Sequence, residues 1–165
     1  MLFTGSLALA LSGCAGYRLG PTNYQRAGAR TAQVVPFANQ TAEPRLGDDT
    51  TAALRKEIQR DATFRLASHD PGDIVITGEI THYFRNGVSF NPADVVTAQE
   101  YRLLITVHVI ARERATDKVL LDKSVAGNTT VRVGNDLPSA ERQARPLLAT
   151  DVAQQITSLL ADGNW

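Results

Sequence analysis

The sequence predicts an α+β fold: a two-layer sandwich in which two helices cover one face of a mostly antiparallel four- to five-stranded sheet, in the order β-α-β-β-β-β-α. Three observations predict it. Segments 74–84 and 100–112 alternate apolar and polar side chains, as half-buried strands do. Segments 44–61 and 139–162 repeat apolar residues at every fourth position, as one face of a helix does. Because each long segment has one apolar face, two layers bury all of them.

The first two elements are a short strand at 32–37 and a helix at 44–61. Pro36 removes one hydrogen-bond donor, which places this strand at an edge or end of the sheet. Pro44 suits the first turn of the helix, because the N–H that proline lacks has no helical partner there. The apolar stripe of the helix repeats at a spacing of four residues: Leu46, Thr50, Leu54 and Ile58.

Two strands are predicted next, at 64–67 and 74–84, on either side of the turn Asp70-Pro71-Gly72. Residues 86–98 contain Asn-Gly and Asn-Pro and are predicted to be a loop or a frayed strand extension. The second strand is expected to direct every second apolar residue into the core: Ile74, Ile76, Ile80 and Phe84.

The strongest strand prediction is 100–112, which is joined through a hairpin connection at 114–118 to a returning strand at 119–133. Gly127 in the returning strand is expected to mark a bulge or bend. One face of the strongest strand is apolar throughout: Tyr101, Leu103, Ile105, Val107, Val109 and Ala111.

The closing helix is predicted to open at Leu137-Pro138-Ser139, with Ser139 as its N-cap and Gly163 as its C-cap. Pro146 lies inside the helical pattern, so the helix is expected to start late or to kink there. Its apolar positions again lie four residues apart: Ala140, Ala144, Leu148, Val152, Ile156 and Leu160.

The N-terminus carries a pattern typical of bacterial lipoproteins. Residues 2–11 form an apolar run of the length of a signal-peptide core, too short to span a bilayer. The sequence Leu-Ser-Gly-Cys that ends at Cys14 resembles a lipobox, in which the cysteine is lipidated after the preceding peptide is removed. The chain then divides into a signal peptide (1–13), a lipidated tether (14–30) and one domain (31–165). The alternative is that Cys14 is an ordinary buried thiol.

The composition and motifs favour a protein that is not an enzyme and holds no cofactor. Lys and Arg number 17 and Asp and Glu number 17, so no net charge favours a nucleic-acid partner. The single cysteine cannot form an internal disulfide. GxSxG, HExxH and phosphate-loop motifs are absent from the sequence. His69, His82 and His108 lack metal-ligand spacing, so no metal site is predicted.

Basic residues around the 114–118 hairpin are the best candidates for an anion site. The guanidinium fork of arginine matches phosphate geometry. The interleaved Glu113, Asp117 and Asp122 are equally typical of an ordinary solvated hairpin, so both interpretations stay open. The four candidates for anion contact are Arg112, Arg114, Lys118 and Lys123.

Several segments resemble the LptE family of lipopolysaccharide-assembly lipoproteins. The string VVPFANQTAEPRL at 34–46 is similar to the family signature, through its Pro, Phe, Asn, Thr, Glu-Pro and Leu. DIVITGEIT at 73–81, EYRLLITVHV at 100–109 and DKVLLDKSVAG at 117–127 resemble family strands. The order and spacing of these segments cover nearly the whole chain after the lipobox.

The resemblance implies a lipid-anchored outer-membrane protein that faces the periplasm or lies inside a partner barrel. The implied partner is the β-barrel LptD, for which the family serves as a plug and assembly factor in lipopolysaccharide transport to the outer leaflet. No catalytic residue is implied. One alternative is an auxiliary lipoprotein of another envelope transporter or secretion channel. Another is a periplasmic hydrolase, which requires a nucleophile and a base in one concave site.

Overall fold

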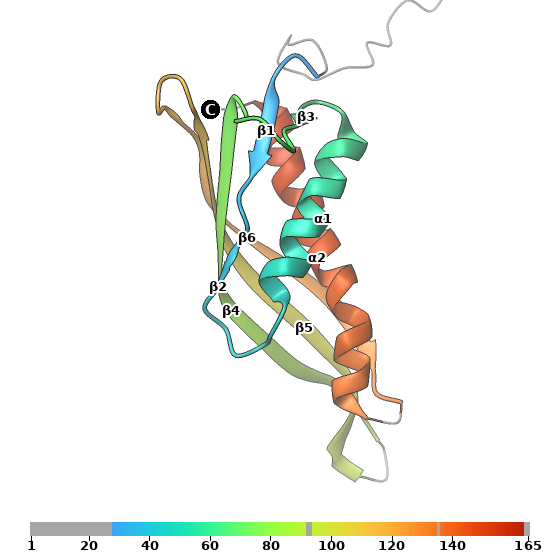
Figure 1. Cartoon of the computed structure of the whole chain (residues 1–165). Helices are drawn as coiled ribbons and strands as arrows, with labels where there is room; N and C mark the ends of the chain where they lie inside the picture. The colour runs from blue at the N-terminus through green and yellow to red at the C-terminus, as the bar shows by residue number, and fades with distance from the viewer. Residues whose placement is uncertain (1–27, 92–93, 135, 164–165) are drawn as a thin grey trace, which may run out of the picture.

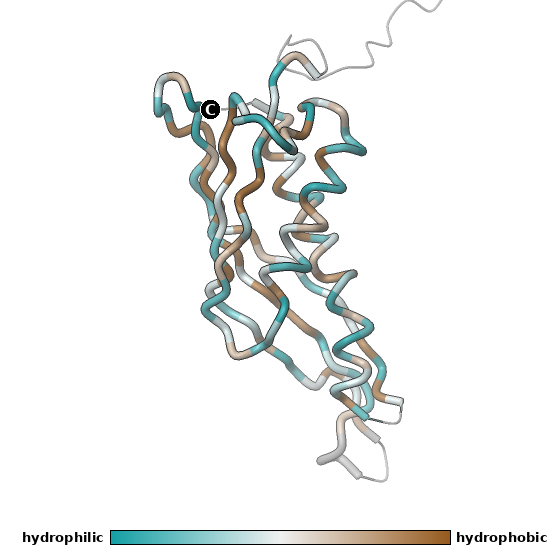
Figure 2. Tube along the Cα trace, viewed as in Figure 1, coloured by the Kyte–Doolittle hydropathy of each residue, from teal (hydrophilic) through white to brown (hydrophobic). Residues whose placement is uncertain are grey.

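The computed structural model describes residues 28–91, 94–134 and 136–163. Both helices lie on the same face of a single sheet, which confirms the predicted two-layer α+β fold (Figure 1). Figure 2 shows hydrophobic and hydrophilic residues alternating along the strands. In chain order the elements are β1 (Thr31–Val34), β2 (Ala38–Asn39), α1 (Leu46–Asp61), β3 (Arg65–Leu66), β4 (Ile74–Asn91), β5 (Asp94–Glu113), β6 (Val119–Arg132) and α2 (Leu137–Asp162).

The sheet has six strands and is mixed, whereas four or five mostly antiparallel strands were predicted. Its strand order is β3-β1-β4-β5-β6, and β2 also pairs with β4. The β4–β5 and β5–β6 pairs are antiparallel, and the short strands β1, β2 and β3 pair in parallel. The predicted strand at 32–37 ends at Val34, and the separate strand β2 follows at Ala38–Asn39. The ladder is interrupted between them because Pro36 has no N–H and the Phe37 N–H donates to Thr51 Oγ1 of α1 at 2.9 Å.

Helix α1 begins at Leu46, two residues later than predicted, and ends at Asp61 as predicted. Arg45 precedes it in the left-handed conformation, with φ 67°, so the chain turns sharply between Pro44 and the first helical residue. Leu46, Leu54 and Ile58 are buried, which confirms the apolar stripe.

Strand β4 contains a bulge that reverses the direction of its side chains. The pairing with β5 shifts between Ile80 and His82, so Thr81 is an extra residue. As a result Tyr83 packs against the core and Phe84 points outward with 55% of its surface exposed. The prediction that Phe84 belongs to the core was wrong, because strict alternation holds only along an uninterrupted strand.

Residues 86–98, predicted to be a loop or frayed strand extension, mostly continue the sheet, with shifts in pairing register between Gly87 and Asn91. Strand β4 extends to Asn91 and β5 begins at Asp94; Gly87 pairs with Tyr101. Figure 1 shows this hairpin extending beyond the end of α2 that begins at Leu137. The Asn-Gly pair therefore lies within a strand, where cross-strand pairing overrides its preference for turns.

Gly127 marks neither a bulge nor a bend, contrary to the prediction. It pairs with Ile105, and the pairing on either side of it is in register. A Cβ at Gly127 would lie 2.4 Å from Val152 Cγ2, so the glycine permits a close approach of α2 to β6. The irregularity in this strand pair lies further along, between Ala111 and Arg112.

Helix α2 runs from Leu137 through Pro146 to Asp162, so it does not start late. Its N-cap is Asp136 rather than Ser139: Asp136 Oδ1 accepts a hydrogen bond from the Ser139 N–H at 2.7 Å. Gly163, with φ 61°, is the C-cap, as predicted. Among the described residues no helix has the length and apolar character that crossing a membrane requires.

Candidate functional site

Neither helix covers the outer face of the sheet (Figure 1). A row of ionisable side chains crosses its middle. His108 of β5 pairs with Glu79 of β4, and its Nε2 lies 2.7 Å from Asp122 Oδ1 of β6. Arg102 and Arg132 lie on the same face, towards the long hairpin. The face therefore presents charges of both signs within a polar surface.

An aromatic patch lies on this outer face beside the bulge. The rings of His82 and Phe84 stack with centroids 5.7 Å apart, and Phe84 lies directly opposite Leu104 on β5. An exposed aromatic ring with an apolar neighbour and a polar surround is typical of protein interaction surfaces. The bulge at Thr81 produces this patch, because without it Phe84 would point towards the helices.

The segment that carries most of the family resemblance forms a tight loop before α1. Asn39 Oδ1 accepts hydrogen bonds from Thr41 N at 3.0 Å and from Thr41 Oγ1 at 2.8 Å. Asn39 Nδ2 donates to the Glu43 carbonyl at 2.8 Å. These side chains satisfy backbone groups that no helix or strand pairs. The Asn, Thr and Glu of the signature thus act structurally.

Arg145 of α2 holds this loop against the helix layer. Its Nη1 donates to Glu43 Oε1 at 3.1 Å and to the Pro44 carbonyl at 3.0 Å, and its Nε lies 3.6 Å from Asp49 Oδ2. The Arg145 side chain is only 11% exposed. Sequence reasoning missed this residue, because a single arginine beside Pro146 gives no periodic signal.

A second polar contact joins α2 to β4 nearby. Arg85 Nη1 donates to Glu141 Oε1 at 3.0 Å, and Glu141 is 5% exposed. Burial, together with the carboxylates of Glu141 and Glu43, raises the pKa of the Tyr83 hydroxyl well above its usual range. Tyr83 is therefore neutral at physiological pH, and this cluster joins the two layers.

The four predicted basic residues occupy different sides of one end of the sheet. Arg112 is on the outer face, with Nη1 3.9 Å from Asp117 Oδ1. Arg114 is engaged in the fold: its Nε donates to the Gly72 carbonyl at 2.9 Å and its Nη2 to Gln33 Oε1 at 2.6 Å. Gln33 stands in one cross-strand row with Val75 and Arg112, so the Arg114 guanidinium reaches the same outer face as Arg112.

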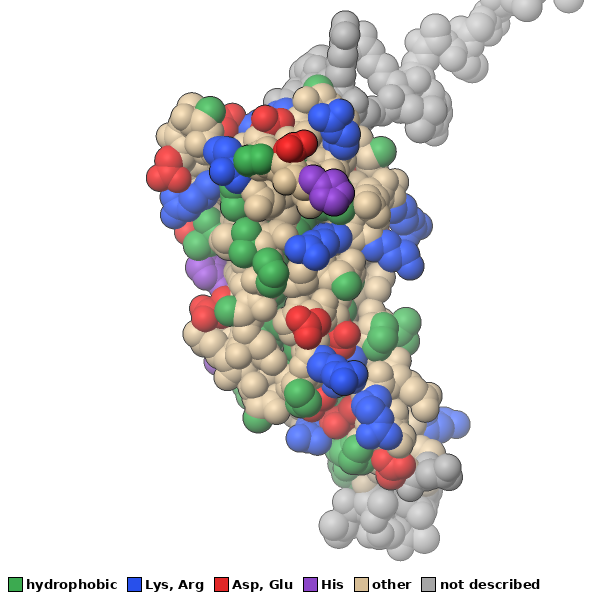
Figure 3. Space-filling view, viewed as in Figure 1, with side chains coloured by type: hydrophobic (Ala, Val, Ile, Leu, Met, Phe, Trp, Pro, Cys, Tyr) green, Lys and Arg blue, Asp and Glu red, His purple; other side chains and the backbone are tan. Residues whose placement is uncertain are grey.

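Lys118 lies in the hairpin connection, whereas Lys123 lies within β6. Lys118 is exposed next to the hairpin turn. Lys123 pairs with Val109, an inward residue of β5, so it projects from the helix-facing side at the edge of β6. Cys14 lies outside the described residues. Figure 3 shows basic and acidic side chains intermingled over the visible face, without a large area of one sign.

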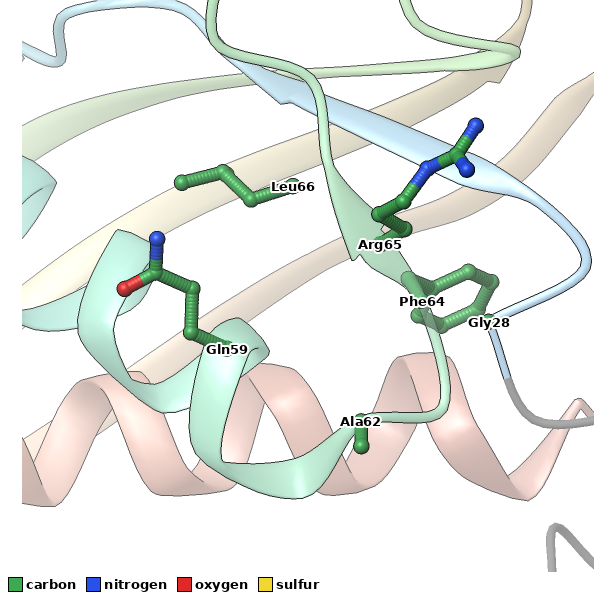
Figure 4. A pocket seen from close by; sticks show the side chains of 6 residues that line it. All are labelled: Gly28, Gln59, Ala62, Phe64, Arg65 and Leu66. Atoms are coloured by element: carbon green, nitrogen blue, oxygen red, sulfur yellow. The ribbon is translucent and has the colours of Figure 1, made fainter.

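An apolar hollow of the surface lies where α1 ends and β3 begins (Figure 4). Its volume is about 460 Å³, and no Ser, Cys, His, Asp or Glu occurs in its described lining. The described lining of this hollow therefore offers no pair of nucleophile and base of the kind that the hydrolase alternative requires. Within the described residues no three His, Cys, Asp or Glu side chains are grouped to hold a metal ion. The lining is Gly28, Gln59, Ala62, Phe64, Arg65 and Leu66.

Several solved bacterial structures share this fold. A protein of Xanthomonas campestris aligns with a TM-score of 0.60 and 10% identity, over 88% of this chain and 91% of its own. A protein of Chlamydia trachomatis gives 0.58 and 9%, over 81% and 96%. A minor lipoprotein of Acinetobacter baumannii gives 0.52 and 16%, over 79% and 91%. A search of curated protein sequences found no match.

The fold therefore defines the class: a small two-layer α+β domain of the kind seen in these bacterial proteins. The family match identifies the chain more specifically than the fold does. The family model of LptE, described as lipopolysaccharide-assembly, matches residues 29–160, and the chain belongs to this family. The match confirms the resemblance carried by the loop before α1 and by the strand segments, and it spans nearly all of the described domain.

Proposed function

We propose that this protein is an outer-membrane lipoprotein that partners the β-barrel LptD, as a plug and assembly factor in lipopolysaccharide transport to the outer leaflet. The observation that carries the proposal is the family match over residues 29–160. The proposal is non-enzymatic: the chain acts by fitting against another macromolecule. The polar, mixed-charge outer face supports it, because the lumen of a membrane barrel is lined by polar side chains.

The anchor is the lipobox cysteine. Residues 1–13 act as the signal peptide, Cys14 receives the lipid, and residues 14–30 tether the domain that follows. Two or three acyl chains at Cys14 hold a protein on a membrane stably, whereas a single chain binds only marginally. The domain then faces the periplasm or lies inside the barrel.

The outer sheet face supplies the contact with the barrel. Its central row, Glu79, His108 and Asp122, offers hydrogen-bond donors and acceptors to a hydrated wall. Phe84 adds an aromatic anchor at one side of this row. Buried aromatic anchors surrounded by polar contacts contribute most of the binding energy of protein interfaces, so Phe84 is the strongest single contact that we propose.

Lipopolysaccharide contact is proposed at the other end of the sheet. Arg112 and Lys118 are exposed and suit phosphate groups; Lys123 extends the basic surface along the edge of β6. Arg114 completes the set, although its guanidinium already binds Gly72 and Gln33. It therefore contributes through its charge and by holding the hairpin in place.

The test is a pull-down of the tagged full-length protein from detergent-solubilised envelope. Mass spectrometry identifies both the partner and the N-terminal peptide. We expect LptD as the partner and an acylated peptide that begins at Cys14. The Cys14→Ala variant is the matched control and loses the lipid. A different channel protein as the partner would favour the auxiliary-lipoprotein alternative; a chain that stays without LptD when the two are coexpressed contradicts the proposal.

A further inference from the structure

The outer edge of β6 is a long backbone edge that no strand covers among the described residues. The Val133 N–H, just after β6, donates to the Gln99 carbonyl of β5 at 2.8 Å. Because backbone groups alternate in direction along a strand, the odd-numbered residues nearby bond β5 and the even-numbered residues direct their N–H and C=O outward. Ala126 and Asn128 are therefore positioned to pair with another strand.

Two side chains of α2 already occupy these positions. Asp151 Oδ2 accepts a hydrogen bond from the Asn128 N–H at 2.9 Å, and Gln155 Nε2 donates to the Ala126 carbonyl at 3.1 Å. Gln155 Nε2 also lies 3.3 Å from Asp151 Oδ2, which holds both side chains in place. They bond one donor and one acceptor that an adjacent antiparallel strand would use.

The sequence gives this edge little other protection. Natural sheets block their edges with charges, prolines, bulges or inward-pointing lysines. Residues 124–131 of β6 contain no charge and no proline, and their pairing with β5 has no bulge. Lys123, which projects from the helix-facing side at one end, is the nearest protecting residue.

We propose that the β6 edge is a strand-pairing surface for a second copy of this chain, and that Asp151 and Gln155 keep it closed. The charged residues of β6 are complementary to those of a second copy of β6, and they favour one pairing register. Antiparallel pairing about a twofold axis at Gly127 places Ala126 opposite Asn128 of the second copy. The same register places Asp122 opposite Arg132 of the second copy, and the symmetry produces this pair twice.

Asp122 and Arg132 are suited to such pairs. Both are even-numbered and lie on the outer face of the sheet, so their side chains meet when they stand opposite each other. Their side chains are 56% and 80% exposed, although each already contacts a neighbour, His108 or Glu100, in its own chain. A register shifted by two residues places Asp122 opposite Thr130 and loses both charge pairs.

The inference does not depend on LptD or on the lipid, and it is tested on the full-length protein in detergent. The variant Asp151→Ala/Gln155→Ala opens the edge. Light scattering after gel filtration over a range of concentrations measures the dimer. We expect the dimer dissociation constant to fall at least tenfold relative to the unaltered chain. Gln143→Ala/Gln154→Ala, which changes two exposed residues of the same helix, is the matched control and leaves the constant unchanged.

The register is tested in the opened variant by charge reversal. Arg132→Asp places like charges opposite each other and is expected to weaken the dimer at least tenfold. Adding Asp122→Arg restores the opposite charges and the dimer. If the opened variant unfolds by circular dichroism, Gln155→Ala alone removes one bond and is expected to give a smaller shift in the same direction. A folded, opened variant that stays monomeric at every concentration, or a dimer indifferent to charge reversal, overturns the proposal.

Discussion

Gly127 of β6 lies so close beneath Val152 of α2 that a Cβ on the glycine would come within 2.4 Å of Val152 Cγ2. The closeness of helix and strand lets Asp151 and Gln155 reach the backbone of the strand. A methyl group here must displace the helix or the strand, and overpacking of this kind typically costs about 1–3 kcal/mol.

Gly127→Ala is accordingly expected to lower the free energy of unfolding by about 1–3 kcal/mol in urea titrations. Gly134→Ala is the matched control, because a Cβ at Gly134 meets no atom within 4 Å. If the two variants are equally stable, the close approach of α2 to β6 does not exist in solution.

Arg145→Met is expected to destabilise the protein by about 2 kcal/mol or more, since it leaves the largely buried Glu43 without its partner. The loop before α1 should open as well, which hydrogen exchange of residues 39–45 would detect. Arg132→Met removes an arginine that is 80% exposed and should cost less than about 1 kcal/mol. Equal losses for the two variants would show that Arg145 does not hold the loop.

The variant Phe84→Ala tests whether β4 is bulged at Thr81 or alternates regularly, because the two cases place Phe84 on opposite faces of the sheet. Because Phe84 points outward, its loss should change the free energy of unfolding by less than about 1 kcal/mol. Ile80→Ala, before the bulge and fully buried, should cost about 2–5 kcal/mol. A cost at Phe84 as large as that at Ile80 would place the aromatic ring in the core after all.

Asp73 is expected to make the stability of the folded protein depend on pH in the acid range. Hydrogen bonds from the Thr31 N–H at 2.7 Å and then from the Thr31 hydroxyl at 2.8 Å lower the pKa of its carboxyl. A lowered folded-state pKa contributes stability that is present above the unfolded value of about 4 and is lost as pH falls through the folded value.

Asp73→Asn should therefore flatten the loss of stability below about pH 4, measured by denaturation at a series of pH values. Thr31→Val keeps the backbone hydrogen bond and should produce a smaller change. If stability falls with pH in the same way in Asp73→Asn and in the unaltered protein, the Asp73 carboxyl does not contribute to the acid dependence of stability.

The sequence predicted the layers well, because the apolar faces of the long elements are uninterrupted. Leu103, Ile105 and Val107 are all fully buried, as alternation requires, and so are Leu148 and Val152 at helical spacing. The bulge at Thr81 could not be predicted, since one inserted residue leaves the composition of a strand unchanged. Phe84, which follows the bulge, was therefore assigned to the wrong face.

Features that depend on contacts between distant segments were also missed. Arg145 and Glu43 are 102 positions apart, and Asp151 and Asn128 are 23 apart. Single polar residues on a helix have no local signal for such partners. The basic residues near the hairpin were predicted as a group from their proximity in sequence, but alternation along β5 and β6 directs Arg112 and Lys123 to opposite faces.

The central claim is that the outer sheet face meets a β-barrel, and in-cell photocrosslinking tests it most directly. Thr106 lies in the middle of this face, opposite His82 on one side and Ala126 on the other. A photoreactive amino acid at position 106 is expected to yield one major covalent product, with LptD. Products only with unrelated proteins, or none from a membrane-bound and folded chain, would contradict the account.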